Sequence, residues 1–161
     1  MAKMVKVGMA DLNICHSPDA ITTLGLGSCV GVALYDKNTK TVGLVHVMLP
    51  DSTKVRQNQN RAKFADTGID YLIELLEKEG AKKSSLTAKI AGGAQMFAFS
   101  SSNDMLRVGE RNVEAVKDKL KKLGIRILAE DTGLNYGRTV EFYPETGDFI
   151  IKSVGKLVKT I

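Results

Sequence analysis

Two residues of this chain could together carry out nucleophilic catalysis. Cys29 follows the turn Gly25-Leu26-Gly27-Ser28, and His46 lies further along the chain. An imidazole can accept the proton of a thiol, and the thiolate can then attack an acyl carbon. Backbone N–H groups around Gly27 and Ser28 could stabilise the oxyanion that forms, because glycine permits backbone angles that turn successive N–H groups inward. The sequence therefore indicates acyl transfer, with Cys29 as nucleophile and His46 as general acid and base.

A predicted β-hairpin connects the two residues. Apolar runs over residues 30–35 and 41–48 predict strands, and the polar segment 36–40 predicts the turn between them. The simplest two-residue turn places Cys29 directly opposite His46, and a slip by one residue makes them diagonal neighbours on the same face. A three-residue loop would put them on opposite faces of the sheet. Their proximity therefore depends on the length of the turn.

A third group should hold the imidazole in place. Thr23 lies on a predicted strand at residues 21–24, where its hydroxyl or its carbonyl could accept the ring N–H. Asp51 and Asp131 are the carboxylate alternatives. We therefore expect Thr23, or one of these aspartates, to orient His46.

Each of these residues also has a structural interpretation. A free cysteine is commonly an inert, buried small hydrophobe, and an isolated histidine or threonine on an apolar strand is commonly part of the core. Gly31 and Ala33 share the predicted face of Cys29, and we expect these small residues to leave space for a substrate side chain. A catalytic site is favoured over a purely structural role because the thiol, the imidazole and the glycine turn are predicted to lie together.

The remaining pattern predicts an α+β sandwich, in which helices flank a mainly antiparallel sheet. Apolar residues at helical spacing predict two helices, one ended by Gly80 and the other by Gly124. A polar loop over residues 50–63 could lie over a site. The other predicted strands are short: 86–90, 125–128, 139–143 and 148–154.

Composition limits the function classes. A chain of 161 residues with 43% hydrophobic and 25% charged residues predicts a single domain over residues 1–161. No long apolar run is present, so we expect a cytoplasmic protein without membrane insertion. The net charge of +5 is spread along the chain, which argues against nucleic acid as a partner and suits an acidic protein. Cys15, His16, Cys29 and His46 lack zinc-ligand spacing, and the glycine turn lacks the dinucleotide fingerprint, so no metal or cofactor is expected.

Three further segments could contribute to a cleft or surface. Residues 91–94 (Ala-Gly-Gly-Ala) and 129–133 (Ala-Glu-Asp-Thr-Gly) both follow predicted strands and could line one cleft. The apolar residues 96–99 are a candidate docking surface, with a buried strand as the alternative.

Five segments occur in an order that resembles the CheD family of chemotaxis proteins. They are Leu24-Gly25-Leu26-Gly27-Ser28-Cys29, His46-Val47-Met48-Leu49-Pro50, Lys89-Ile90-Ala91-Gly92-Gly93-Ala94, Gly109-Glu110-Arg111-Asn112 and Ala129-Glu130-Asp131-Thr132-Gly133. The resemblance covers residues 4–155. One departure is Leu134, where the family often has a second glycine.

The resemblance implies a chemoreceptor glutamine deamidase, which converts receptor glutamine side chains into glutamates and releases ammonia. The family's cysteine, histidine and threonine fall on Cys29, His46 and Thr23. It further implies a fold similar to the catalytic domains of deamidating toxins, and binding to CheC, a phosphatase that family members stimulate. An alternative is that the protein acts mainly as a non-catalytic binding regulator of CheC.

Overall fold

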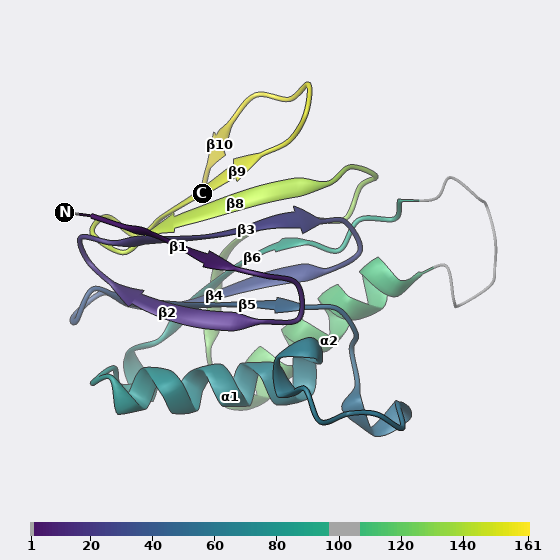
Figure 1. Ribbon diagram of the computed structural model, residues 1–161, viewed down its shortest axis with the longest axis horizontal. Helices are drawn as coiled ribbons and strands as arrows, with labels where there is room; N and C mark the ends of the chain where they lie inside the picture. Colours follow the sequence, from purple (N-terminus) through teal and green to yellow (C-terminus); the bar gives the residue numbers. More distant parts are fainter. Residues whose placement is uncertain (1, 97–106) are drawn as a thin grey trace.

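The computed structural model describes residues 2–96 and 107–161, which form two β-sheets and two α-helices in three layers (Figure 1). The first sheet contains, in spatial order, β1 (Met4–Val7), β3 (Ala20–Leu26), β8 (Arg138–Tyr143), β9 (Asp148–Lys152) and β10 (Lys159–Thr160). The second contains β2 (Leu12–His16), β5 (Thr41–Val47), β4 (Val30–Asp36), β6 (Thr87–Gly92) and β7 (Arg126–Thr132). The chain crosses between the sheets after β1, β2, β3 and β7.

The helices cover the face of the second sheet that points away from the first (Figure 1). α1 (Ala65–Lys78) and α2 (Val108–Leu123) each bury one apolar stripe against this sheet. Gly80 follows α1 and Gly124 follows α2, with φ of 97° and 72°. Helices commonly end in this left-handed conformation, and glycine adopts it without strain because it has no Cβ. Both predicted helix ends are confirmed. Short 3-10 turns at Ser52–Lys54, Arg61–Lys63 and Lys83–Ser85 complete the elements.

Two hydrophobic clusters hold the three layers together. One lies between the sheets and includes Leu26, Leu44 and Phe142, and the other lies between the second sheet and the helices. β4 and β5 contribute to both, which is why their sequences are nearly continuous apolar runs rather than alternating ones. His46 lies on β5 and Cys29 directly precedes β4, so both candidate catalytic residues lie at strands that are buried on both faces.

The predicted α+β sandwich is confirmed, with more strands than the sequence indicated. β1, β2 and β10 were not predicted, because they are short and carry exposed polar residues between their few buried ones. Pairing is mainly antiparallel, with one parallel pair in each sheet, β1 with β3 and β6 with β7. Among the described residues no helix is long and apolar enough to cross a membrane.

Candidate functional site

The β4–β5 hairpin takes the slipped register. Gly31 pairs with His46 and Asp36 with Thr41, so four residues form the turn and Cys29 lies two positions before the partner of His46. An even number of turn residues preserves the alternation of faces. Cys29 packs in the cluster between the sheets together with Leu44, which places it on the same side as His46. The structure thus brings the two residues to one face, as predicted for this register.

Thr23 of β3 reaches His46 across the space between the sheets. Its Oγ1 lies 2.8 Å from Nδ1 of His46 and 2.7 Å from the carbonyl oxygen of Val7. The Val7 carbonyl can only accept, so it takes the single hydroxyl hydrogen, and Nδ1 must therefore donate to Oγ1. This fixes the imidazole as the Nδ1–H tautomer. The hydroxyl, rather than the carbonyl, of Thr23 is the group that holds the ring.

The remaining ring nitrogen of His46 has an available lone pair. Nε2 is buried and has no hydrogen-bond partner within the described part of the chain. Burial lowers the pKa of His46 below its ordinary value of 6.5, and burial raises the pKa of the Cys29 thiol above 9.0. The charged forms of both groups are disfavoured, so near neutral pH the site holds a neutral imidazole and a neutral thiol.

The glycine turn is fixed through three consecutive carbonyl groups. Those of Gly27 and Cys29 accept hydrogen bonds from the N–H groups of Ala94 (2.9 Å) and Gly93 (2.8 Å). The carbonyl of Ser28 accepts from the side-chain amide of Asn112 at 2.9 Å. The turn is therefore attached to the end of β6 and to α2 immediately before the cysteine.

Gly92 is required for this attachment. Its φ is 110°, and a Cβ added there would lie 2.2 Å from the carbonyl oxygen of Cys29. No side chain fits in that space. Gly133 then donates its N–H to the Gly92 carbonyl at 3.0 Å, and Gly93, Thr132 and Gly133 line one cleft of about 300 Å³. The two glycine-containing segments of the sequence therefore do meet in one cleft.

The structure sets aside the two carboxylate alternatives to Thr23, and the expectation of free space at Gly31 was wrong. The carboxylate of Asp51 accepts hydrogen bonds from Thr53, whereas that of Asp131 accepts them from Arg138 and Lys159, so neither aspartate holds His46. The space above Gly31 is not free for substrate. A Cβ added to Gly31 would lie 3.1 Å from the side chain of Leu26 and 3.7 Å from that of Thr23. Glycine allows the facing sheet to approach at this point, which brings Thr23 to His46.

Asn112 was missed as a site residue from the residues alone. It is fully buried on α2, in line with Val116 and Leu120 at spacings of four. Its amide nitrogen donates to the carbonyls of Ser28 and Met48, both at 2.9 Å. A polar residue within an otherwise apolar helical stripe is the sequence signal that could have identified it.

Other candidate residues lie elsewhere. Cys15 is buried in the core, where burial and the charge of Asp19 raise its pKa to about 12, and His16 contacts Thr41 and Glu79. Within residues 2–96 and 107–161, no group of three or more metal-ligating side chains is present. Leu134 adopts a left-handed φ of 60°, which glycine would adopt with less strain.

The predicted docking segment lies mostly beyond the described residues. Met96 is half exposed and its side chain lies over Gly27, and residues 97–99 are outside the described part of the chain.

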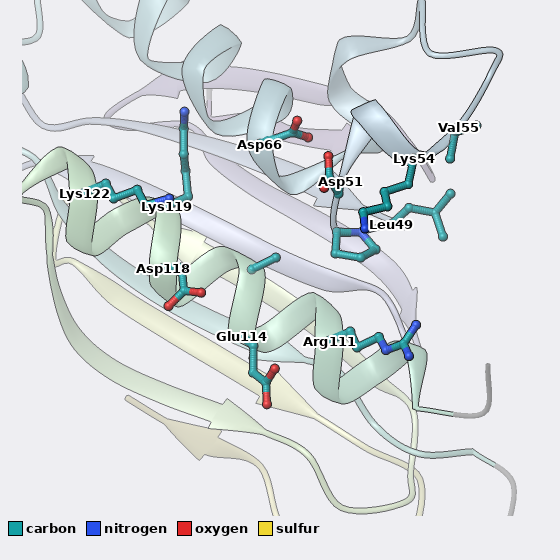
Figure 2. Close-up of a pocket in the computed structure, with 12 residues that line it drawn as sticks. Leu49, Asp51, Lys54, Val55, Asp66, Arg111, Glu114, Asp118, Lys119 and Lys122 are labelled. Atoms are coloured by element: carbon teal, nitrogen blue, oxygen red, sulfur yellow. The ribbon is translucent and has the colours of Figure 1, made fainter. Parts of the chain in front are cut away.

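Figure 2 shows a cleft of about 770 Å³ whose lining includes residues of α1, α2 and the loop after β5, and His46 is not among the residues that line it. The loop after β5 supplies Asp51 and Lys54 to its lining, α1 supplies Asp66, and α2 supplies Glu114 and Lys119. The long loop therefore helps to form this charged cleft, and Cys29 is not among the residues that line it.

Comparison with known proteins identifies the family. A family model described as CheD chemotactic sensory transduction matches residues 48–153. A protein of Lachnoclostridium phytofermentans named as a probable chemoreceptor glutamine deamidase CheD is 70% identical over the whole of both chains. Proteins named chemoreceptor glutamine deamidase CheD are 57% identical in Halalkalibacterium halodurans, over the whole of both chains, and 50% identical in Bacillus subtilis, over 99% of this chain and 97% of the relative.

A solved structure, the hypothetical protein YfiH of Bacillus licheniformis, matches 72% of this chain and 47% of its own with a TM-score of 0.44 and 16% identity. This likeness is too weak to bear on function. The match to the family model and the full-length relatives are sufficient by themselves, and they show that this chain belongs to the CheD family.

Proposed function

We propose that this protein deamidates glutamine side chains of chemoreceptors, with Cys29 as nucleophile, His46 as general acid and base, and Thr23 as the residue that orients His46. The observation that carries the proposal is the state of the imidazole. Thr23 holds the proton on Nδ1, which leaves Nε2 as a buried base without a partner among the described residues. The names of the relatives supply the substrate class.

The reaction divides into two steps on these groups. Nε2 of His46 takes the thiol proton, Sγ of Cys29 attacks the side-chain carbonyl carbon of glutamine, and the imidazolium donates that proton to the departing nitrogen, so that ammonia leaves. A thioester then links Cys29 to the receptor. His46 next takes a proton from water, the hydroxide displaces the thiolate, and the thiolate recovers its proton. Glutamine and water thereby give glutamate and ammonia.

The glycine turn offers donors for the oxyanion. The N–H of Gly27 is engaged by the carbonyl of Gly25 at 3.0 Å, whereas those of Ser28 and Cys29 have no acceptor within the described part of the chain. In a trans peptide the N–H points opposite to the preceding carbonyl. Because the carbonyls of Gly27 and Ser28 are both fixed by hydrogen bonds, the orientation of the two free N–H groups is fixed as well. We assign the oxyanion donors to Ser28 and Cys29.

A neutral thiol and imidazole suit this chemistry. The pKa of Cys29 is raised and that of His46 is lowered by burial, so a thiolate–imidazolium ion pair is disfavoured. The thiolate then forms as the carbonyl carbon is attacked, with Nε2 as the immediate proton acceptor. This avoids a permanently reactive thiolate, and it makes the neutral form of His46 the active one.

The test is incubation of the purified protein with a chemoreceptor cytoplasmic fragment, followed by mass spectrometry of the fragment. We expect a gain of about 1 Da at particular glutamines, as an amide becomes a carboxylic acid through the thioester. No gain, with a correctly folded protein, would contradict the proposal.

Two finer points rest on the family resemblance. We propose that the protein acts in the cytoplasm and that it binds the CheC phosphatase. The presence of Cys29, His46 and Thr23 in one buried arrangement supports an enzyme over a protein that only binds CheC. A binding-only regulator would stimulate CheC and leave receptor glutamines unchanged.

A further inference from the structure

The structure assigns Asn112 of α2 as a positioning residue for the oxyanion site, which it holds through the carbonyl group of Ser28. This inference rests on the proposed deamidase function. Asn112 is fully buried, and both of its amide hydrogens are used, one on the carbonyl of Ser28 and one on that of Met48. It thereby joins the residue before Cys29 to the residue two positions after His46.

The orientation of the Asn112 amide is fixed by its partners. Two carbonyl oxygens at 2.9 Å can only accept, so the nitrogen must face them and the oxygen Oδ1 must face away. Oδ1 is buried and has no partner among residues 2–96 and 107–161. A buried polar atom without a partner is costly, and an apolar side chain would avoid that cost. What Asn112 provides and an apolar side chain would not is therefore the pair of hydrogen bonds to the carbonyls of Ser28 and Met48.

The bond to Ser28 acts on the Cys29 amide through one rigid peptide unit. The carbonyl of Ser28 and the N–H of Cys29 belong to the same planar group and point in opposite directions. Holding the carbonyl on Asn112 therefore holds the N–H in a single direction, and this N–H has no other hydrogen bond among the described residues. Loss of the bond would free the peptide to rotate and would weaken oxyanion stabilisation without removing thiol or imidazole.

The test compares two reactions of Cys29. Attack on glutamine forms an oxyanion, whereas alkylation by iodoacetamide displaces iodide and forms none. In Asn112→Leu we expect kcat for deamidation of a receptor fragment to fall at least about tenfold, as for a weakened oxyanion site. We expect the rate of Cys29 alkylation to stay within about twofold of wild type, because thiol and imidazole are intact. Fragment ions must locate the label, since Cys15 and Cys29 occur in one tryptic peptide, residues 7–37.

The matched control is Val116→Ala, which removes packing from the same buried stripe of α2 and touches neither Ser28 nor Met48 through a hydrogen bond. It should lose stability and keep kcat. Equal kcat in Asn112→Leu and Val116→Ala, or loss of alkylation in parallel with kcat in Asn112→Leu, would overturn the inference. If the proposed function itself is wrong, the wild-type protein will not deamidate the fragment, and this result is distinguishable from failure of the inference about Asn112.

Discussion

The hydroxyl of Thr23 lies 2.8 Å from Nδ1 of His46, and this hydrogen bond joins the two sheets of the molecule at the candidate site. Thr23 belongs to β3 of the first sheet and His46 to β5 of the second. The threonine uses its one hydrogen on the carbonyl of Val7, so its oxygen accepts the proton of the ring. The position of the imidazole therefore depends on how the sheets pack.

Replacing Thr23 by valine should impair catalysis more than folding. Val keeps the shape of Thr and removes the acceptor of the Nδ1 proton, so the imidazole loses its fixed tautomer. We expect kcat to fall at least about tenfold, a part of the 10²–10⁴-fold that a positioned acid and base contributes. Thr23→Ser keeps the hydroxyl and should retain most activity. Steady-state deamidation of a receptor fragment measures both.

Thr22→Val is the control for the loss of a buried hydroxyl. Thr22 is the neighbouring residue and donates to the carbonyl of Val140 at 2.7 Å, away from His46. It should lose stability of order 1 kcal/mol, the usual worth of a hydrogen bond, and keep its kcat. A similar kcat in Thr22→Val and Thr23→Val would show that Thr23 does not act through His46.

Activity should persist to pH values below the ordinary pKa of histidine. Burial lowers the pKa of His46 below 6.5, and the neutral imidazole is the form that accepts the thiol proton. We therefore expect the acid limb of kcat/KM to lie below pH 6.5. An acid limb at or above that value would mean that a different group, or a charged His46, controls the rate.

Stability should decrease as the pH falls, in part through His46. Its folded pKa is lower than the unfolded value near 6.5, so the unfolded chain takes up the proton first. The contribution is complete above pH 6.5 and is lost as the pH falls through the folded pKa. Urea unfolding at about pH 5 and about pH 8 should show a larger loss for wild type than for His46→Gln, which cannot titrate. Equal losses would contradict this assignment.

Gly92→Ala should disrupt the attachment of the cysteine turn. The added Cβ would lie 2.2 Å from the Cys29 carbonyl oxygen. We expect a loss of stability of about 2 kcal/mol or more and loss of activity, because strain and a backbone clash combine. Gly124→Ala is the control, since its φ of 72° is also left-handed but no atom lies within 4 Å of the added Cβ. It should be less destabilised and stay active; the reverse order would contradict the account.

The site residues that lie close together in the sequence could be placed from the sequence, whereas contacts between distant segments could not. Cys29 and His46 lie on one hairpin, so strand periodicity reduced the question to the length of the turn, and the even number of turn residues in the structure places them on one face. The role of Gly31 was misjudged because the alternation of one strand does not reveal which side chains of the facing sheet will occupy the space. Asn112 lies far along the chain, on a helix whose packing the hairpin does not determine. Contacts made by tertiary packing were thus the ones that the sequence pattern left open.

The strands also differed in how well the sequence predicted them. Long apolar runs over β4 and β5 predicted these strands well, because both of their faces are buried. The short strands β1 and β10 lie at the two edges of the first sheet, where each pairs with a single strand, and their own residues carry little periodic signal.

The central claim is that Cys29 is the nucleophile, and one comparison tests it most directly. Wild type, Cys29→Ala and Cys15→Ala are each incubated with the same chemoreceptor fragment, and intact-mass spectrometry follows the fragment while circular dichroism verifies the folds. Cys15 is the matched control, because it is also a buried cysteine in the cluster between the sheets. We predict a gain of about 1 Da per modified glutamine with wild type and Cys15→Ala and no gain with Cys29→Ala. Continued deamidation by a folded Cys29→Ala protein would contradict the account.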